Sequence, residues 1–488
     1  MTPILETTSQ ESVARHLHDL PAHGRKAHIV SLGCPKNLVD TERYMALLDS
    51  QGYSLADSPE EADLILVNTC GFIDNAKTES IDAIIELGEG KRPGQSLVVA
   101  GCLVDRYRES LVSEFPEVDL WLDLADFGET PERLARVTQA SLPEDYRPLA
   151  MTANRNGAGI PWASFRRVML TPRHASYLKI SEGCDHSCSF CAIPSFKGKQ
   201  RSVALGTLVA EAEALARNGV RELTLIGQDT VAYGRDLDPS RSVNLRTLLE
   251  RLCEIENLRW LRVLYTYPTR LAEELEWAYL NLPKMVPYLD LPLQHLSDPV
   301  LERMRRGTPY ESIREHILRL RSSVPSLVIR STCIVGFPGE GSSDFKLLRE
   351  RFEELEVDHL GVFRYSDEEG TRGFDLDRKV PARTAAKRHQ EMFAWSAEHC
   401  QGRARGRLGD VYEVLVDGAC EAPLEVFPGA RPEGQWWRGR WYGQAPEIDG
   451  CVYFQGRNIK PGGFVGVRLE SASYPDYLGT PLIDPPEG

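Results

Sequence analysis

Apolar and polar positions in the first part of the chain follow two different periods, which predicts strands separated by helices. HIVSLGC, DLILVNTC and SLVVAGC are short apolar segments that each end in a cysteine, and helical patterns lie between them. This βαβ alternation predicts a parallel sheet with right-handed crossovers. Since the pattern fades near Leu142, we expect an α/β domain over residues 26–142.

A second alternating region follows a stretch rich in Pro, Gly and Asn, which we interpret as a linker over residues 143–173. Amphipathic runs such as ALGTLVAEAEALARNG and SDFKLLRERFEELE separate its strand-like segments. These segments are SYLKISEGC, ELTLIGQDT, WLRVLYTYP, PYLDLPLQH, LVIRSTCIVGFPG and HLGVFRYS. Six βα units predict a partial or complete barrel, with its functional loops at the carboxyl ends of the strands. We place this domain at residues 174–403, closed by a helix around RTAAKRHQEMFAWSAEHC.

From about Leu408 the pattern changes to short segments that are rich in β-branched and aromatic residues. The segments are DVYEVLVDG, QWWRGRWYGQ, GCVYFQG and GFVGVRLE. They predict a small antiparallel β-barrel over residues 404–479, of a kind that binds nucleic acid or protein. Trp436, Trp437 and Trp441 could form a stacking platform or a partner surface, and we expect at least one of them in the barrel core. The fold class of the whole chain is therefore α/β with a small all-β end.

Composition excludes several classes of protein. The 488 residues are too many for one core, so two to four domains are expected. The net charge of −14 gives no general attraction to nucleic acid or to an anionic membrane surface. The sequence has no apolar stretch near the roughly 20 residues that a membrane span needs, and its start does not resemble a signal peptide. We therefore expect a cytoplasmic protein that has no membrane partner.

Eleven cysteines in a cytoplasmic chain are more often metal ligands or buried thiols than disulfides. Cys184, Cys188 and Cys191 stand together after a predicted strand. Three thiolates at this spacing can bind three irons of a cubane cluster and leave the fourth iron open. The alternatives are three free buried thiols, or a structural zinc site in which His186 is the fourth ligand.

Three other cysteines, Cys34, Cys70 and Cys102, each end a predicted parallel strand and each adjoin a glycine. A single cysteine is by default a buried apolar thiol. However, the carboxyl ends of neighbouring parallel strands meet at one edge of a sheet, where ligands gather. This placement favours a second cluster site, although the buried-thiol alternative stays open.

The segment CDHSCSFC after the first strand of a βα barrel resembles the radical S-adenosylmethionine (SAM) superfamily. The resemblance implies that a 4Fe–4S cluster on Cys184, Cys188 and Cys191 chelates SAM at its open iron and cleaves it to a 5′-deoxyadenosyl radical. It also implies cofactor contacts at two later strand ends. These are Gln228 and Asp229 near the methionine end of SAM, and Gly336, Gly339 and Glu340 near its adenine. The glycines could instead be ordinary turn residues.

SLGCPKNLVDTE, LVNTCGF and VAGC resemble the N-terminal domain of the methylthiotransferases, in which a radical SAM domain and a TRAM barrel follow. GCPKN and SEGCDHSCSFCAIP resemble the branch that modifies ribosomal protein S-twelve. The resemblance implies two 4Fe–4S clusters, with the one on Cys34, Cys70 and Cys102 holding the sulfur that becomes a methylthio group. It also implies an electron donor and a sulfur donor as partners.

The sequence departs from the family pattern at two places. Thr41 replaces a more usual Ser, and the loop Lys197–Val203 lacks a second Arg after its Ser. The remaining cysteines match no family ligand and are expected to be packing residues. They are Cys253, Cys333, Cys400, Cys420 and Cys451. Arg303, Arg305 and Arg306 could hold a carboxylate or phosphate, but we expect a solvated helix face.

Three functions compete at this point. They are methylthiolation of an aspartate β-carbon in ribosomal protein S-twelve, the same chemistry on a tRNA adenosine, and electron transfer without catalysis. The barrel region from Asp410 to Gly488 holds twelve Asp or Glu and six Lys or Arg, whereas an RNA-binding barrel is expected to be basic. We therefore expect the ribosomal protein or the small ribosomal subunit as the partner rather than tRNA, although Arg431, Arg438 and Arg440 could form a local basic patch.

Overall fold

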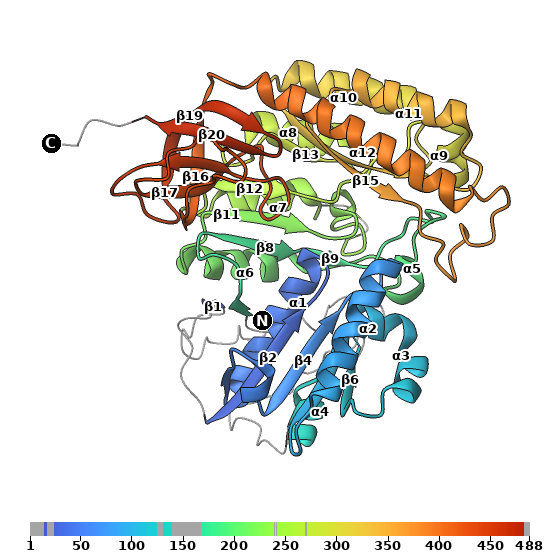
Figure 1. The fold of residues 1–488 in the computed structure, drawn as a ribbon, viewed down its shortest axis with the longest axis vertical. Coiled ribbons are helices and arrows are strands. Elements are labelled where there is room, and N and C mark those ends of the chain that lie inside the picture. Colours follow the sequence, from blue (N-terminus) through green and yellow to red (C-terminus); the bar gives the residue numbers. More distant parts are fainter. Residues whose placement is uncertain are drawn as a thin grey trace. The chain divides into compact units, whose positions relative to one another are not determined.

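The structure is a computed structural model that describes residues 14–16, 24–123, 130–138, 167–238, 240, 242–268 and 271–482 (Figure 1). The chain forms two compact units. One comprises the described residues up to Ser176 together with Val203–Gly219, and the other comprises Tyr177–Ser202 and the residues from Val220 onward. None of the described helices is long and apolar enough to cross a membrane.

A five-stranded sheet in the order β3-β2-β4-β5-β6 forms the centre of the first unit, and all of its strand pairs are parallel. The strands are β2 (Arg25–Ser31), β3 (Tyr53–Leu55), β4 (Leu64–Thr69), β5 (Ser96–Gly101) and β6 (Leu120–Leu122). The helices are α1 (Pro35–Ser50), η2 (Pro59–Glu61), α2 (Asp74–Glu89), α3 (Cys102–Glu114), α4 (Thr130–Thr138) and α6 (Leu205–Arg217). The three apolar segments of the sequence form β2, β4 and β5, so the parallel sheet is confirmed.

The core of this sheet follows from the apolar pattern of its central strands. β4 is buried along its whole length, because both of its faces are covered. Ile65, Val67 and Val99 pack with Ile84 of α2 and Leu103 of α3. The helices are therefore fixed on the sheet so that the segments joining each strand to the next helix lie at one edge.

The predicted linker lies mainly outside the described residues, which resume at Arg167. β7 (Arg167–Met169) pairs in parallel with β1 (Ala14–His16) and packs against α1. The buried Arg167 donates 2.7 Å to Glu211 of α6 and also pairs with Glu42 of α1. Part of the expected linker is therefore a strand that belongs to the first unit.

Six strands of the second unit follow one another in chain order and form two three-stranded sheets, β8-β11-β12 and β13-β14-β15. Backbone hydrogen bonds from Leu261 to Lys284 and from Val286 to Leu261 join the two sheets. The strands are β8 (Ala175–Lys179), β11 (Glu222–Ile226), β12 (Trp260–Val263), β13 (Tyr288–Asp290), β14 (Val328–Val335) and β15 (His359–Arg364). This arrangement is the partial barrel that the six βα units predict.

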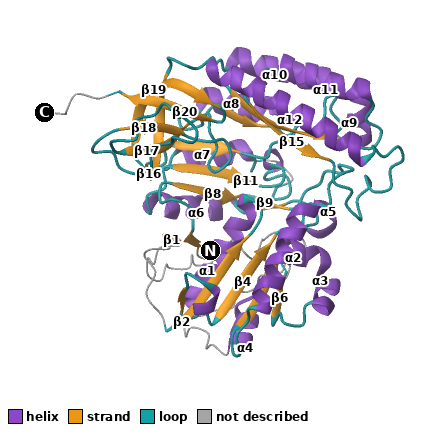
Figure 2. Cartoon of the chain, in the orientation of Figure 1, coloured by secondary structure: helices purple, strands orange, loops and turns teal. Residues whose placement is uncertain are grey.

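Helices lie between these strands, and α12 (Ala382–Arg405), which follows β15, packs along β14 and β15 (Figure 2). The expected closing helix is therefore present. The shorter elements are β9 (Ser181–Glu182), α5 (Ile193–Phe196), β10 (Arg201–Ser202) and η5 (Thr230–Ala232). The other helices are α7 (Leu245–Cys253), α8 (Leu271–Asn281), α9 (Asp298–Met304), α10 (Tyr310–Ser323) and α11 (Ser342–Glu354).

A closed five-stranded barrel follows α12, in the order β16-β17-β18-β20-β19. Its strands are β16 (Val411–Cys420), β17 (Trp436–Trp441), β18 (Val452–Gln455), β19 (Phe464–Ser473) and β20 (Asp476–Pro481). The expectation of a purely antiparallel barrel is wrong at one pair, because β18 and β20 run parallel. A closed ring of five strands cannot alternate direction all the way round, so at least one pair must be parallel. Trp436 and Trp441 are buried in the barrel core, as expected.

Candidate functional site

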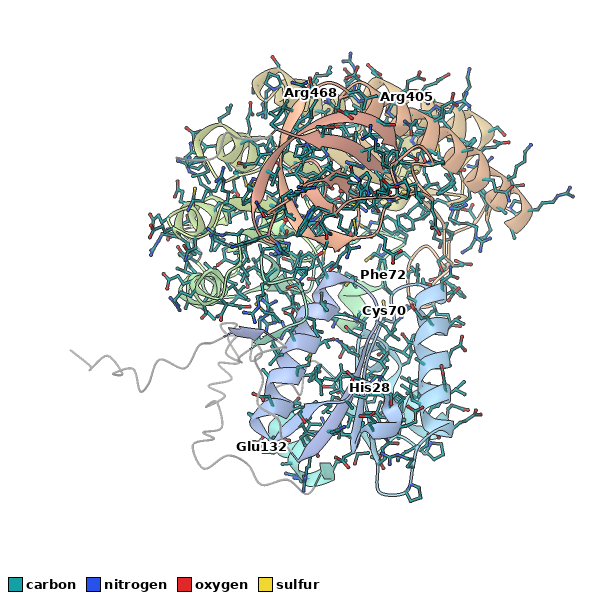
Figure 3. The ribbon with its side chains drawn as sticks, turned by 60° about the vertical axis from the view of Figure 1, so that its left-hand side comes forward. His28, Cys70, Phe72, Glu132, Arg405 and Arg468 are labelled. Carbon is teal, nitrogen blue, oxygen red and sulfur yellow. The ribbon has the colours of Figure 1, made fainter. Side chains whose placement is uncertain are left out.

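The three scattered cysteines of the first unit lie where neighbouring strands of its sheet end. Cys34 precedes α1, Cys70 directly follows β4, and Cys102 is the first residue of α3. Figure 3 shows Cys70 and Phe72 at one end of this sheet and Glu132 at the opposite end. Since β2, β4 and β5 are adjacent in the sheet, the sequence prediction that one edge carries all three thiols agrees with the topology.

Glycines bring the loops that carry these cysteines into contact. A Cβ atom on Gly33 would lie 2.8 Å from the Cβ of Cys70, and one on Gly71 would lie 2.8 Å from the backbone oxygen of Cys102. Gly33 also has a φ of +94°, which side chains with a Cβ disfavour. The glycines therefore let the loops that carry these cysteines approach one another closely.

Asn37 is the side chain that ties the three loops together. Its Nδ2 donates to the carbonyl of Leu32 after β2 (3.0 Å) and to that of Thr69 on β4 (2.9 Å). Its Oδ1 accepts from the thiol of Cys102 (3.5 Å). Asn37 lies within the GCPKN motif, but the motif alone indicated no role for it. The only signal in the sequence was a polar side chain three residues after a candidate ligand, and its burial is visible only in the structure.

The electrostatic setting of these thiols suits a metal cluster whose net charge, together with its thiolate ligands, is negative. Burial raises the pKa of Cys70, and the adjacent Cys34 acts in the same direction. α1 and α3 begin at Cys34 and Cys102, so their positive N-terminal ends face the same edge. Thiolates there need a metal to stabilise them, and the helix ends favour the net negative charge of an iron–sulfur cluster with thiolate ligands. The residues present fit such a cluster.

Cys184, Cys188 and Cys191 of the second unit line a cavity of about 570 Å³. Its wall is completed by residues of the cysteine loop, of α5, of the turn before β10 and of the segment after β15. They are Asp185, His186, Ser187, Pro194, Ser195, Gly198, Lys199, Gly370, Thr371 and Arg372. Burial, together with the neighbouring Cys188, raises the pKa of Cys184 and of Cys191 to about 12. Three mutually close thiols at an open cavity fit the ligand set of a cluster that has one open iron.

Two residues between the cysteines anchor this loop. The backbone N–H of Ser189 donates to the carbonyl of Met304 (3.0 Å), and its hydroxyl donates to that of Arg303 (2.7 Å). Phe190 packs against the apolar group that contains Met304 and Phe337. The loop is therefore held at the end of α9, which fixes the direction of the thiols on either side.

The loop Lys197–Val203, where the sequence departs from the family pattern, has a structural role. β10 pairs antiparallel with β9, and the carbonyl of Gly198 accepts from the backbone N–H of Cys184 (3.1 Å). This loop therefore supports Cys184 through a backbone hydrogen bond. That support does not involve the Arg that the family pattern has after the Ser. Burial opposes ionisation of Glu182 on β9, but Lys179 and Lys197 outweigh it and lower the pKa of this carboxyl to about 2.

His186 is engaged by its neighbours. Its Nε2 pairs with Asp229 Oδ2 at 2.7 Å, and its ring stacks on Tyr267 with centroids 3.6 Å apart. Among the described residues, no group of three or more His, Cys, Asp or Glu side chains is placed to hold one metal ion. A cubane cluster is different, because each thiolate binds a different iron.

Gln228 and Asp229 lie at the end of β11, but neither lines the cavity. Asp229 caps η5 by accepting from the backbone N–H of Val231 (3.1 Å). Gln228 donates its Nε2 to Glu182, while its Oε1 and the hydroxyl of Ser181 are buried without a hydrogen-bond partner in the described part of the chain. Buried acceptors without partners at this strand end fit a ligand that donates hydrogen bonds, such as the ammonium group of SAM.

Gly336, Gly339 and Glu340, the other three predicted cofactor residues, also lie outside the cavity wall. A Cβ on Gly336 would lie 2.6 Å from Ala385 of α12, and one on Gly339 would lie 2.5 Å from Arg303. Glu340 accepts from the backbone N–H of Gly336 (2.9 Å) and from Arg388 (2.6 Å). These residues fix the turn after β14 against its neighbours, which is the alternative role that the sequence left open.

Arg306 corrects the expectation that its arginine cluster forms a solvated helix face. Arg305 ends α9 in the left-handed conformation, with a φ of 57°, and the chain reverses there. Arg306 is therefore directed inward, is 5% exposed, and lies with Nη1 3.7 Å from Cys188 Sγ. Gly307 directly after it was the sequence signal that the helix had ended. Arg303 binds the carbonyl of Pro338 and the side chain of Asp377.

The position of Arg440 likewise rules out a basic patch formed by all three arginines of the barrel. It is buried and pairs with Asp417 at 2.9 Å and with Glu222 of β11. Arg431 and Arg438 are exposed. Of the three candidate cations, two are therefore left at the surface of an acidic barrel.

Comparison with known proteins assigns a family to each region. Residues 26–123 match an uncharacterized protein family, UPF0004, residues 178–352 match the radical SAM superfamily, and residues 408–482 match the TRAM domain. A radical SAM domain implies one 4Fe–4S cluster and SAM. The structure of TsrM, a radical SAM methyltransferase from Kitasatospora setae solved with tryptophan and a SAM analogue, has a TM-score of 0.50 at 14% identity. It covers 70% of this chain and 73% of its own, and at this identity it shows the fold alone.

Curated relatives match nearly the whole chain. Ribosomal protein uS12 methylthiotransferase RimO from Sorangium cellulosum is 42% identical over 475 residues, which is 95% of this chain and 92% of the relative. The protein of the same name from Symbiobacterium thermophilum is 42% identical over 466 residues, which is 93% of this chain and 90% of the relative. The protein of the same name from Acetivibrio thermocellus is 38% identical over 457 residues, which is 93% of this chain and 98% of the relative.

Proposed function

The chain belongs to the RimO family of radical SAM methylthiotransferases, and from this premise we propose that it inserts a methylthio group at the β-carbon of an aspartate in ribosomal protein uS12. The observation that carries the proposal is the pair of three-cysteine sites, each at the carboxyl ends of strands. A cytoplasmic location follows from this substrate, and a sulfur donor and an electron donor are required.

The two sites divide the work. When bound, SAM and a 4Fe–4S cluster supply the one-electron chemistry that removes hydrogen from an unactivated carbon. Cys184, Cys188 and Cys191 would hold that cluster, and Gln228 and Ser181 would accept from the SAM ammonium. Asp229 orients His186, while Gly336, Gly339 and Glu340 act indirectly by fixing the turn after β14. Cys34, Cys70 and Cys102 would hold a second 4Fe–4S cluster, which would supply a binding site for the sulfur.

We propose three functional domains, at residues 26–142, 174–403 and 404–479, with residues 143–173 between the first two. The charge of the barrel favours a basic protein as the partner. Its Lys and Arg residues are fewer than its Asp and Glu residues, and one of them, Arg440, is buried. Lys199 and Arg372 at the cavity wall suit a substrate carboxylate. Complementary charge speeds encounter and is screened by salt.

The test compares cells with and without the gene by mass spectrometry of both uS12 and tRNA. We expect a methylthio-aspartate in uS12 that disappears with the gene, and tRNA that does not change. Loss of methylthioadenosine from tRNA, with uS12 unaltered, would assign the chain to the tRNA-modifying chemistry instead.

A further inference from the structure

Arg306 is a buried cation for which the described residues provide no carboxylate partner. Only 5% of its surface is exposed, and its Nε is buried without a hydrogen-bond partner within the described part of the chain. A buried charge is costly unless it is paired, so a guanidinium in this position implies an anion nearby. The nearest groups that can carry a negative charge are the thiols of the radical-SAM cysteine loop.

Two contacts hold the guanidinium of Arg306 in place, and a third holds its backbone. Nη2 donates to the carbonyl of Pro292 (2.5 Å), and the guanidinium carbon lies 4.1 Å from the centroid of the Tyr267 ring. His186 covers one face of that ring at 3.6 Å, so the guanidinium must lie on the other face. The Tyr267 hydroxyl donates to the carbonyl of Arg306 (3.0 Å). An arginine fixed in this way keeps its charge at a constant distance from the thiols.

The position of that charge is set relative to one particular ligand. Arg306 Nη1 lies 3.7 Å from Cys188 Sγ, and the hydroxyl oxygen of Tyr267 lies 3.8 Å from the same sulfur. Hydrogen bonds and charges around cluster sulfurs are known determinants of reduction potential.

We propose that Arg306 is a positioning residue that restrains the Cys188 thiolate and raises the reduction potential of the cluster on Cys184, Cys188 and Cys191. One-electron reduction adds a negative charge to the cluster, and a fixed positive charge close by stabilises the reduced form over the oxidised one. The inference is independent of which macromolecule receives the methylthio group, and therefore goes beyond the proposed function.

The test is an anaerobic potentiometric titration of the full-length chain, with dithionite as reductant and electron paramagnetic resonance as readout. A parent variant with Cys34, Cys70 and Cys102 changed to Ala isolates the radical cluster. Arg306→Gln in this parent should keep its iron and titrate at a more negative midpoint potential. Arg306→Lys, which retains the charge, should titrate closer to the parent. Arg305→Gln is the matched control, because its exposed side chain lies next in sequence, and its midpoint should equal that of the parent.

A parental midpoint in Arg306→Gln, at full iron content, would overturn the proposal. Should Arg306→Gln lose its cluster, Arg306→Lys decides the question. Retention of iron with a near-parental midpoint by the Lys variant supports a requirement for the charge. Loss of iron from the Lys variant as well would mean that Arg306 is needed only for the fold of the loop, which also overturns the proposal.

Discussion

At the scale of single residues, both candidate sites depend on buried polar side chains that join loops. Asn37 reaches the segments after β2, β4 and β5, while Ser189 joins the second cysteine loop to α9. Each of these side chains uses its hydrogen-bonding groups on backbone or thiol partners rather than on solvent. These hydrogen bonds therefore hold the loops that carry the thiols in place.

The first prediction concerns Asn37. Replacement by Ala leaves the carbonyls of Leu32 and Thr69 without their donor, and each buried unsatisfied group costs about 1–3 kcal/mol. We expect Asn37→Ala to lose iron from the first unit, so that reconstituted protein falls from about eight irons per chain toward about four. Colorimetric iron analysis checks this, with Lys36→Ala as the neighbouring control. A full complement of iron in Asn37→Ala would contradict the role given to this side chain.

The sequence points to the candidate ligand cysteines more directly than to the residues around them. The cysteines could be found because their spacing and their places after strands carry the signal. The roles of Arg306 and Tyr267 could not be predicted, since they depend on where α9 ends and on which strand ends meet. Gly336 and Gly339 illustrate the same limit. Their lack of a side chain leaves room for Ala385 and Arg303, and both of these residues are distant from them in the sequence.

At the scale of elements, the helices and strands that support the second site are joined by buried ion pairs. Asp358 precedes β15 and accepts from Arg403 (3.2 Å) and Arg407 (2.6 Å) at the end of α12. It also accepts from the backbone N–H of Ile329 on β14 (2.8 Å). The periodic patterns predicted β14, β15 and α12 individually, but not this joint, because it combines residues from three separate segments.

The second prediction is the pH dependence of this joint. Burial alone would raise the pKa of Asp358, but Arg407 and Arg403 outweigh it and lower the pKa below its usual value of 3.8. The carboxylate therefore stabilises the fold fully above about pH 4, and this stabilisation is lost as pH falls through the lowered pKa. Asp358→Asn should lower the free energy of unfolding by about 3–5 kcal/mol at pH 7.

Urea unfolding of wild type and Asp358→Asn, followed by circular dichroism from pH 7 to pH 3, measures this effect. The difference between the two proteins should stay constant down to about pH 4 and then shrink. Asp367→Asn is a suitable control, since that carboxylate is exposed at the surface and should have a small effect. A difference that already disappears between pH 7 and pH 5 would assign the pH dependence to another group.

At the scale of the whole molecule, the C-terminal barrel is part of the second compact unit. Arg440 of β17 pairs with Glu222 of β11, Arg262 of β12 donates to the carbonyl of Tyr442 (2.8 Å), and Tyr288 of β13 donates to Asp449. Sequence predicted the barrel from its short aromatic segments and its closing Trp residues. It did not predict this interface. No sequence pattern marks the charged residues that form it, and what distinguishes them is that they are buried.

The third prediction tests that interface with a matched pair of substitutions on one strand. Arg440→Met removes the buried ion pairs of Arg440 with Asp417 and with Glu222, so it should lower stability by about 3–5 kcal/mol. Arg438→Met removes an exposed cation from the same strand and should change stability by about 0.5 kcal/mol or less. Urea midpoints distinguish the two. Equal midpoints for the two variants would show that the buried pair does not stabilise this joint.

The division of labour between the two cysteine sites is the central claim, and one measurement tests it directly. Purified protein with reconstituted clusters is incubated anaerobically with SAM, dithionite, sulfide and uS12, and both 5′-deoxyadenosine and the mass of uS12 are determined. We predict that wild type forms both products, that Cys70→Ala forms 5′-deoxyadenosine but leaves uS12 unmodified, and that Cys188→Ala forms neither. Methylthiolated uS12 from Cys70→Ala, or 5′-deoxyadenosine from Cys188→Ala, would contradict the assignment of these two sites.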